Sequence, residues 1–515
     1  MGRLLSPGID VREFDQSPYA PSFPSSAFAV VGSASKGPMD TPTLITDTGT
    51  LNDIFGNARS DSISGEIFYG LYASDQYLKA GRALWFCRVG TEVASADLAA
   101  ASGFMFDGDG LTNAITLTAP SNGTWGNATT VTVSAGLAAG TYKIDVKSGT
   151  YPVETYDQIV VGTANESDVN YIETRINGFS AYIAVVDLEV GTTLSATTAT
   201  MSGGTNGCAL SVTDIIGAYN TPPTIPSTGL QTFTNVEEVL IDMVAVPGWS
   251  GASVVTALIT LAEARGDCVA LIDPPAGLNP ITVVDWHNGT SGIVGAPTAA
   301  LDSSYAACYA FWCDGQDAFL EATVRVPPSG MAAFVYAKTV RDGNVWDAPA
   351  GLKRGVLTGV ISVEHSPTQG ERDYMYSGGD AINPIAKPFN NSAYVIWGQR
   401  TLQRASTSLD RVHVRRLLIY LERIIARTCR SLIFEPNDAK TWNQLKRVIR
   451  PTLDDLAESA LTQYLIVCDS TTNTAATIAR NELHAKVFVQ PTNVAEMIEI
   501  DVIALASGVS FNEVL

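Results

Sequence analysis

The pattern of apolar and polar residues changes several times along this chain, and each change predicts a different kind of structure. Residues 208–378 alternate buried strands with helices: LIDMVAVPG predicts a strand, GASVVTALITLAEARG a helix that ends at Gly266, and DCVALIDPP the next strand. Residues 26–95 show a similar mixture, with the strands AFAVVG and ALWFCRVG around the helix SGEIFYGLYASDQYLKAG. Residues 208–378 therefore predict α/β structure, and residues 26–95 a compact element of strand, loop, helix and strand.

Residues 96–207 have a different pattern. They are rich in Thr, Ser, Gly, Ala and Asn, and short alternating strands such as TVTVSA, TYKIDVK and AYIAVVDL are separated by Gly and Asn turns. Only three basic residues occur in this segment. The pattern predicts an inserted β-sandwich or small barrel that is displayed on a surface.

The two ends of the chain have the pattern of extended arms. In residues 1–25, Pro18, Pro21 and Pro24 exclude a helix, and GIDVREFD before them alternates apolar and charged residues as an edge strand does. Residues 497–515 begin with a second alternating strand, MIEIDVIALAS. Twenty extended residues reach about 60 Å, so such an arm can contact another subunit.

Residues 379–496 predict two helices and then strands, an α+β arrangement. In the first helix, seven apolar residues fall within about 80° of Val414 when each residue turns by 100°. They are Leu417, Leu418, Leu421, Ile424, Ile425, Cys429 and Leu432. Four arginines fall at about 160° to 220°, on the opposite side. This arginine stripe consists of Arg416, Arg423, Arg427 and Arg430. We expect one face of the helix to be core and the other to present the stripe.

The charge distribution makes the stripe unusual. The chain of 515 residues carries 32 Lys+Arg and 52 Asp+Glu, a net charge of -20, yet residues 400–450 hold 12 basic and 4 acidic residues, which leaves -28 for the rest. A solvated helix face is one interpretation. Nucleic acid is disfavoured because aromatic residues do not cluster here and the remaining chain would repel a polyanion. An acidic protein surface fits better, since guanidinium groups pair bidentately with carboxylates.

Composition sets further limits. Charged residues make up 16% and hydrophobic residues 46%, as in a subunit of a large assembly or a large secreted β protein. No apolar run precedes Pro7, and none approaches the roughly 18 residues of a membrane span, so we expect a cytoplasmic protein without membrane insertion. The cysteines form no CxxC pair, and we expect buried, reduced thiols; a cross-link between neighbouring copies is the alternative. The seven are Cys87, Cys208, Cys268, Cys308, Cys313, Cys429 and Cys468.

Candidate catalytic chemistry is weak. Asp242, His287 and Ser329 occur in the chain order of subtilisin-type hydrolases, but a triad is recognised by geometry and not by order. Ser329 has a sufficient structural role as a helix cap behind two prolines, and His287 fits a turn. GSASKGP lacks the ending of a phosphate loop, and with four histidines no metal site is expected. A serine hydrolase stays the alternative from a different class.

Several motifs in order along the chain resemble those of the contractile tail sheath proteins of bacteriophages. They are PGIDVREFD, AVVGSASKGPMDTPTLITD, FG at residues 55–56, NGTWGN at 122–127, VAVPG, ARGDCVALIDPP, VPPSGMAAFVYAKT, VWDAPA, INPI, WGQRTL, VHVRRLL at 412–418, FEPND and TWNQLKRVI. Each motif alone is weak, but their order is specific.

This resemblance implies a multidomain structural protein without catalysis or cofactor. The implied parts are a central subtilisin-like α/β domain, the inserted β domain on the outside, and an inner α+β domain that is conserved in the family and built from both chain ends. The corresponding residues are the arm 1–25, the inner domain 26–95 and 379–496, the insertion 96–207, the central domain 208–378, and the C-terminal strand and tail 497–515.

The resemblance also implies a mechanism and partners. Such subunits stack as six-membered rings around a tail tube and contract by rigid-body rearrangement, which drives the tube through the host envelope. Terminal strands would link neighbouring subunits by β-augmentation. The residues implied are Ile9, Val11 and Phe14 in one arm and Ile498, Ile500 and Val502 in the other. Expected partners are further copies of this chain, the tail tube protein, and baseplate and tail terminator proteins, in a virion assembled in the host cytoplasm; a phage-derived contractile injection particle is the alternative.

Overall fold

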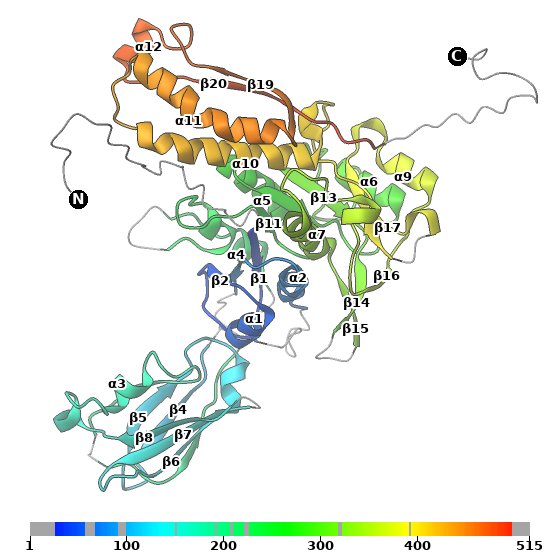
Figure 1. Cartoon of the computed structure of the whole chain (residues 1–515). Helices are drawn as coiled ribbons and strands as arrows, with labels where there is room; N and C mark the ends of the chain where they lie inside the picture. The colour runs from blue at the N-terminus through cyan, green and yellow to red at the C-terminus, as the bar shows by residue number, and fades with distance from the viewer. Residues whose placement is uncertain are drawn as a thin grey trace, which may run out of the picture.

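The computed structural model describes residues 26–56, 67–90, 99–149, 152–190, 193–205, 210–220, 226–317, 322–390 and 393–496. Its described parts form three regions along one axis (Figure 1). A β-rich region lies at one end, an α/β body in the middle, and a pair of long helices with a strand hairpin at the other end.

An eight-stranded sheet forms the middle of the α/β body. Its strand order is β18-β17-β13-β12-β11-β1-β3-β2; the six inner strands are parallel, and β18 and β2 join the two edges antiparallel. The inner strands are β1 Phe28–Gly32, β3 Leu84–Arg88, β11 Met243–Ala245, β12 Val269–Ile272, β13 Ala306–Ala310 and β17 Ile382–Ala386, and the edge strands are β2 Thr43–Ile45 and β18 Val395–Ile396. The inner strands are almost entirely buried, as parallel strands covered on both faces are.

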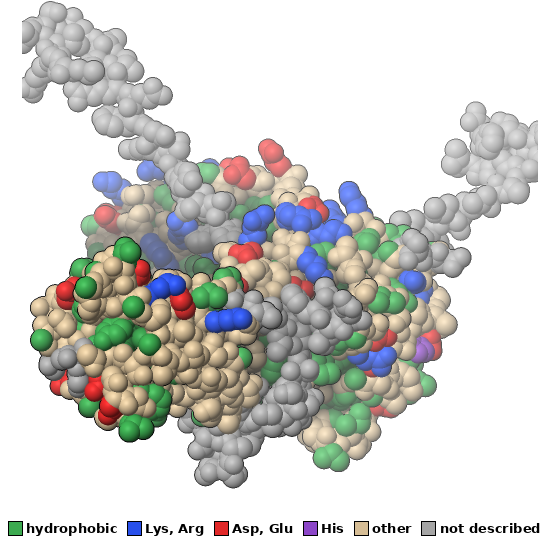
Figure 2. Space-filling model, turned by 90° about the horizontal axis from the view of Figure 1, so that it is seen from below, with side chains coloured by type: hydrophobic (Ala, Val, Ile, Leu, Met, Phe, Trp, Pro, Cys, Tyr) green, Lys and Arg blue, Asp and Glu red, His purple; other side chains and the backbone are tan. Residues whose placement is uncertain are grey.

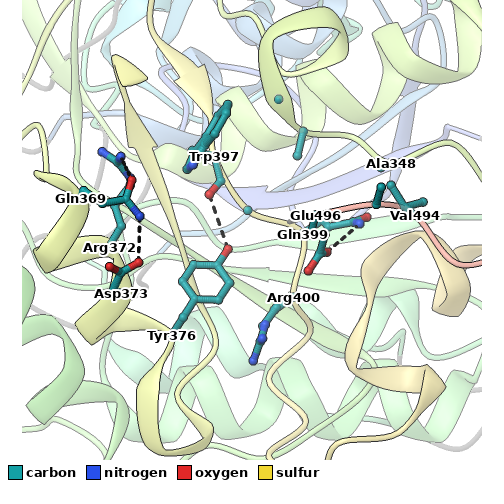
Figure 3. A pocket seen from close by; sticks show the side chains of 14 residues that line it. Ala348, Gln369, Arg372, Asp373, Tyr376, Trp397, Gln399, Arg400, Val494 and Glu496 are labelled. Carbon is teal, nitrogen blue, oxygen red and sulfur yellow. Dashed lines mark hydrogen bonds between the residues drawn. The ribbon is translucent and has the colours of Figure 1, made fainter. Parts of the chain in front are cut away.

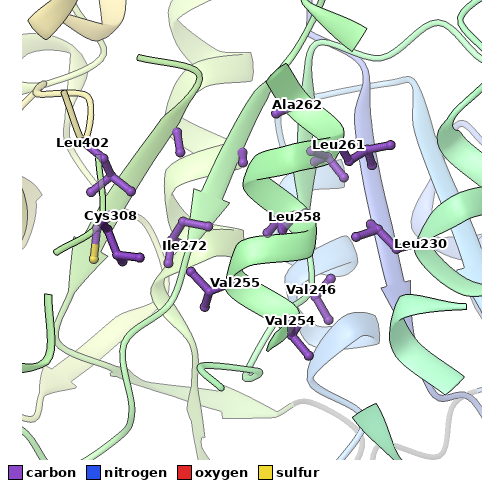
Figure 4. Packing of buried hydrophobic residues seen from close by; sticks show 14 of the residues in the cluster. Leu230, Val246, Val254, Val255, Leu258, Leu261, Ala262, Ile272, Cys308 and Leu402 are labelled. Atoms are coloured by element: carbon purple, nitrogen blue, oxygen red, sulfur yellow. The ribbon is translucent and has the colours of Figure 1, made fainter. Parts of the chain in front are cut away.

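Helices cover both faces of this sheet. On one face lie α5 Ala252–Arg265 and α6 Pro280–His287, and on the other α2 Tyr69–Leu78 and α7 Pro328–Asp342. Successive residues of β1 point to opposite faces, so Ala29 and Val31 join the core around α5 while Phe28 and Val30 join the core around α7. Figure 4 shows α5 placing Val254, Leu258 and Leu261 over the sheet. Helix α5 ends at Gly266, which adopts the left-handed conformation with φ of 70°.

Residues 99–205 fold into two antiparallel sheets that share one core of apolar side chains. One sheet has the order β10-β6-β7-β8 and the other β4-β5-β9. The strands are β4 Ser102–Phe106, β5 Asn113–Thr118, β6 Thr129–Ala135, β7 Tyr142–Ser148, β8 Glu154–Ile159, β9 Ala184–Asp187 and β10 Thr198–Thr200, with the short helix α3 Ile172–Ile176 beside them. Seen from below, this region carries few charged side chains (Figure 2).

The last region contains two long helices and a hairpin. Helix α10 spans Val412–Cys429 and helix α11 spans Ala439–Ala457. Strands β19 Leu461–Val467 and β20 Lys486–Pro491 pair antiparallel, with α12 Ala475–Ala479 in the connection. Leucines of α10 and α11 form one core with the inner side of the hairpin. This region lies directly above the sheet body (Figure 1).

Smaller elements complete the body. A three-stranded sheet of order β15-β14-β16 projects from it, with β14 Cys313–Asp317, β15 Ala322–Val326 and β16 Val360–Val363. The remaining α-helices are α1 Thr48–Phe55, α4 Val212–Ile216, α8 Gly351–Arg354 and α9 Gln369–Met375. Among the helices that the structure describes, none combines the length and apolar character needed to cross a bilayer.

The sheet joins segments that the sequence assigned to different domains. Strand β1 pairs with β3 and also with β11, which follows more than 200 residues later. Strands β17 and β18, from residues 379–496, extend the same sheet. Residues 26–95 and 379–496 thus both add strands to the sheet of residues 208–378, while the expected division into an inner and a central domain stays a prediction.

Cysteine placement matches the expected pattern in the described residues. Cys87, Cys268, Cys308, Cys313 and Cys468 are buried free thiols. Cys429 is free and partly exposed, and Cys208 lies outside the described residues. Of the described cysteines, only Cys429 has the exposure that the alternative of a cross-link between copies would require.

Candidate functional site

The first half of helix α10 is covered on both of its faces. Leu417 and Leu421 are buried in the core that α10 shares with α11. The opposite face lies on the α/β body, where Arg416 is only 4% exposed. An amphipathic helix normally turns its charged face to solvent, but this half of the helix is enclosed between two layers.

Arg423 connects α10 to the start of the central strand β11. Its Nη1 donates to Asp242 Oδ1 over 2.7 Å, and its Nη2 donates to the carbonyl oxygens of Ile241 and Asp267 over 2.9 and 3.0 Å. Asp242 Oδ2 also accepts from the Ala27 N–H over 2.8 Å. Burial raises the pKa of the Asp242 carboxyl, while the Arg423 charge and the Ala27 N–H oppose that shift.

Arg416 is held in a different way. Its guanidinium lies 4.6 Å from the centre of the Tyr336 ring, and Tyr336 and Tyr309 share a hydrogen bond of 2.6 Å. Burial lowers the pKa of Arg416. Its two terminal nitrogens have no hydrogen-bond partner among the described atoms, and a cavity of about 10 Å³ beside them, also lined by Asp242, is close to the volume that one water needs.

The tube- or subunit-facing role of the arginine stripe stays a prediction, but two of its four members are held by contacts within the chain. Arg416 and Arg423 make contacts within the chain, whereas Arg427 and Arg430 are exposed near the end of α10. Helical periodicity separated the two faces of the helix. It could not reveal that the α/β body, from residues much earlier in the sequence, covers the arginine face.

Helix α11 carries an exposed basic face that the sequence reasoning missed. Thr441, Leu445, Ile449, Leu453 and Leu456 are buried at intervals of three or four residues. On the other side, Lys440, Arg447 and Arg450 are exposed, and none of the three forms an ion pair with a described residue. We call these three residues the α11 basic face. The signal was present in the 3.6-residue period of the leucines, since about 100° per residue places this face opposite them.

A shallow hollow accompanies this face. It has a volume of about 710 Å³ and is lined by Asn443, Lys446, Arg447, Arg450, Pro451, Asp454 and Asp455. The hollow thus combines basic side chains with the carboxylates of Asp454 and Asp455, while the α11 basic face beside it has no ion-pair partner among the described residues, in a chain of net charge -20. An acidic macromolecular surface is the chemistry that complements it.

The hairpin β19–β20 leaves two strand edges open. Within the described residues, no third strand pairs with either of its members. One face packs on α11 through Val487 and Val489, while Leu465 and Phe488 on the other face are 58% and 54% exposed. An edge of unpaired N–H and C=O groups is a template for another strand.

The candidate residues for strand donation lie outside the described residues. They are Ile9, Val11 and Phe14 in the first arm and Ile498, Ile500 and Val502 in the second. The described chain begins at residue 26 and ends at residue 496, beside the region of α10.

Ser329 lies inside α7 and is fully buried, so it is not the expected N-cap. The cap position is Pro327, and the Asp273 carboxylate from the end of β12 accepts from both the Ser329 N–H and the Ser329 hydroxyl over 2.7 Å. Asp273 also accepts from the Gly248 N–H over 3.2 Å. Burial raises the pKa of Asp273 to about 7.

The other two residues of the hydrolase alternative have separate partners as well. His287 is the last residue of α6 and is buried; its Nδ1 lies 3.7 Å from Asp380, and burial lowers the pKa of the imidazole. Asp242 pairs with Arg423. Within the described residues, none of Asp242, His287 and Ser329 contacts another of the three, so the structure does not support the serine hydrolase.

Comparison with known proteins shows which proteins this chain is similar to. Residues 404–504, which contain α10, α11 and the hairpin, match the phage tail sheath C-terminal domain. A tail sheath protein of Enterobacteria phage T4 is 28% identical over 303 residues, which are 55% of this chain and 44% of the T4 protein. A tail sheath protein of Vibrio phage KVP40 is 27% identical over 50% of this chain and 40% of its own length. The chain thus spans less than half the length of these curated relatives.

Solved structures extend the likeness over most of the chain. The sheath tail protein from Listeria innocua matches with a TM-score of 0.59 at 13% identity, covering 87% of this chain and 89% of its own. A sheath chain of the PVC extracellular contractile injection system in its contracted state matches with a TM-score of 0.55 at 16% identity, covering 98% of each chain. The mixed α/β fold with several sheets is therefore one that sheath proteins share. As its ordered motifs indicated, this chain is similar to the contractile tail sheath proteins of bacteriophages and of related injection systems.

Proposed function

We propose that this protein is the structural subunit of a contractile tail sheath. Subunits would polymerise as stacked six-membered rings around a tail tube and contract by rigid-body rearrangement, which drives the tube through the host envelope. The observation that carries the proposal is the hairpin β19–β20 in the tail sheath C-terminal domain, with both outer edges open among the described residues. A polymer that must rearrange without falling apart needs such connections between subunits.

Strand donation would supply the connections. The alternating segments around Ile9, Val11 and Phe14 and around Ile498, Ile500 and Val502 have the pattern of strands that can add to the open edges of a neighbour's hairpin. Five net hydrogen bonds at about 1 kcal/mol each would tether each arm by several kcal/mol. The domains between the arms can then rotate while the strands stay paired.

The tube contact is better assigned to helix α11 than to the whole arginine stripe. Lys440, Arg447 and Arg450 are exposed and have no ion-pair partner among the described residues, whereas Arg416 and Arg423 are held inside the chain. Exposed ion pairs contribute about 0.2 to 1 kcal/mol each. Contacts of this size to an acidic tube can form in every ring and still release during contraction.

The finer architecture follows the same family. The eight-stranded sheet with its helices would correspond to the subtilisin-like domain, and residues 99–205 to an outer domain away from the tube. The role would be structural, without catalysis, and further partners would be the baseplate and the tail terminator. The particle would be a phage virion assembled in the host cytoplasm; a phage-derived contractile injection particle is the second candidate, favoured by the likeness to the PVC sheath chain.

Deletion of residues 1–16 tests the donated strand. We expect a soluble subunit that unfolds at the same temperature as the full chain, because the eight-stranded sheet and the cores on its two faces are built from elements that begin at β1. The truncated subunit should fail to form sheaths under conditions in which the full chain forms them, as judged by negative-stain electron microscopy. Normal tubular sheaths from the truncated protein would refute strand donation.

A further inference from the structure

Side chains at the two ends of one stretch of helix α10 connect it to the first and the last part of the described chain. Near its N-terminal end, Arg411 precedes the first helical residue and contacts Glu496, the last described residue. Three turns further, Arg423 contacts Asp242, which in turn binds Ala27 at the start of the described chain. About 18 Å of rigid helix separates Arg411 from Arg423.

The contact at Glu496 is bidentate. Arg411 Nε donates to Glu496 Oε1 and Arg411 Nη2 donates to Glu496 Oε2, both over 2.8 Å. Two parallel hydrogen bonds fix the plane of the carboxylate as well as its position. The Arg411 and Glu496 side chains are 24% and 35% exposed, so the pair lies partly in solvent.

Gln399 donates a third hydrogen bond to Glu496 and thereby connects Glu496 to helix α10. Its Nε2 donates to Glu496 Oε1 over 3.0 Å, at the side of a pocket of about 580 Å³ (Figure 3). Because the amide nitrogen faces Glu496, its oxygen faces His413, whose Nδ1 must donate over 2.9 Å. The carbonyl oxygen of Gln399 accepts the Val412 N–H over 2.8 Å. Every contact to Glu496 in this group therefore traces back to the first turn of α10.

The contact at the other end is more deeply buried. Ala27 is 4% exposed, and its N–H donates to Asp242 while its carbonyl oxygen accepts the N–H groups of Asp242 and Met243 over 2.8 and 3.0 Å. Arg423 holds the same carboxylate from α10. The carboxylate of Asp242 thus lies between Ala27 and helix α10.

We propose that α10 acts as a strut that fixes the directions in which the two arms leave the subunit, with Arg411–Glu496 and Arg423–Asp242 as its two clamps. The inference rests on the proposed sheath function, because direction matters when an arm must reach a neighbour. Eight extended residues span about 26 Å, so an error of about 20° at the exit displaces the far end by about 9 Å, roughly twice the spacing between paired strands. Arg411 and Glu496 are in this sense positioning residues.

Reversal and exchange of the Arg411–Glu496 clamp test the proposal in the assembled state. An ion pair that lies partly in solvent contributes little to folding, so Arg411→Glu and Glu496→Arg should change the unfolding temperature of the subunit only slightly. Each should lower the yield of sedimentable sheath at least about tenfold, because linked binding is lost when geometry forbids it. The double exchange R411E/E496R should recover at least about half of the wild-type yield. Arg325→Glu, which breaks the bidentate Arg325–Asp314 pair on β14 and β15, is the matched control and should assemble normally.

A measurement on the isolated subunit separates this inference from the sheath function. Spin labels at Glu499→Cys and Arg447→Cys, with Cys208 and Cys429 replaced by serine, report the distance from the C-terminal exit to α11. We expect a narrow distance distribution in the otherwise unchanged subunit, a broad one in R411E, and a narrow one again in R411E/E496R. Equal widths in all three would overturn the clamp even if sheaths form. If neither the wild type nor any variant polymerises, but the distance distributions have the expected widths, the sheath function is contradicted. The clamp proposal would then still hold.

The second clamp has a parallel test. Arg423→Lys keeps the charge but cannot reach all three acceptors that the guanidinium holds. With a label at Ser22→Cys in place of the label at residue 499, we expect R423K to broaden the distribution while far-ultraviolet circular dichroism stays native. An unchanged width would remove Arg423 from the strut.

Discussion

At the residue scale, buried charge joins the C-terminal helices to the α/β body. Arg423 and Asp242 are 15% and 10% exposed at their side chains and lie 2.7 Å apart. Charges this far from water are tolerated because each finds several partners, and Arg423 uses two backbone carbonyl groups besides the carboxylate. Such a site is sensitive to the loss of one partner.

Replacing Arg423 with methionine should therefore destabilise the subunit strongly. Removal of one partner leaves the other charge buried and uncompensated, which costs about 3 to 5 kcal/mol of unfolding free energy. Arg447→Met on the exposed face of α11 is the control and should change stability by no more than about 0.5 kcal/mol. Urea unfolding of both variants measures the difference, and equal losses would contradict the buried clamp.

Asp273 gives the subunit a pH-dependent stability. Burial raises its pKa to about 7 in the folded state from an ordinary value of 3.8, so between these values the folded protein binds more protons than the unfolded chain. The stability contribution of Asp273 is present below about pH 4 and is lost as the pH rises through about 7.

Asp273→Asn removes this titration. Between pH 4 and 7, unfolding free energy should fall more steeply with pH in the wild type than in D273N, by up to about 1.4 kcal/mol per pH unit. Above pH 8 the two curves should run parallel. Urea unfolding at several pH values measures the slopes, and parallel curves throughout would show that Asp273 ionises normally.

Sequence reasoning found the right residue types but not their partners. The period of α10 correctly set the leucines apart from Arg416 and Arg423, because periodicity depends only on helix geometry. The covering of the arginine face depends on Asp242 and Tyr336, which lie 181 and 80 residues away from their partners in the chain. Such long-range contacts leave no mark in a local pattern.

At the scale of elements, the hairpin and helix α11 have different proposed roles in the C-terminal domain. The hairpin offers strand edges, and α11 covers one of its faces while presenting Lys440, Arg447 and Arg450 outward. The first property supports permanent links between subunits, and the second supports contacts that release. A variant that changes charge on α11 should therefore affect tube binding and not folding.

The double reversal R447E/R450E tests this division. We expect an unchanged unfolding temperature, because both side chains are exposed, and a yield of sheath around tail tubes that is lower by at least about tenfold, since losses repeat in every copy. Raising the salt concentration should likewise weaken the binding of the wild type to tail tubes, because salt screens exposed charges. The control R325E should bind tubes as the wild type does. Unchanged tube binding by R447E/R450E would move the tube contact away from α11.

The sequence predicted single helices and strands well, but it did not predict which strands pair with one another. The helix expected between Gly251 and Gly266 is α5 at Ala252–Arg265, because an apolar period and a left-handed glycine mark it locally. The pairing of β1 with both β3 and β11 could not be predicted, since each is a short apolar strand with no feature that specifies its partner.

At the scale of the whole molecule, the three described regions lie along one axis. The C-terminal helices and hairpin lie at one end, the β-rich region at the other, and the buried sheet forms a rigid body between them (Figure 1). The contacts of Asp242 with Ala27 and of Glu496 with Arg411 connect the first and last described residues to the rest of the fold. Contraction would then move the subunit as one unit while its arms bend.

Negative-stain electron microscopy of the purified full chain tests the central claim most directly. We predict that the protein forms rings or hollow tubes at low salt or on addition of tail tubes. They should have six-fold symmetry and a lumen wide enough for a tail tube. A protein that stays monomeric under all these conditions, or that forms filaments without a lumen, would contradict it.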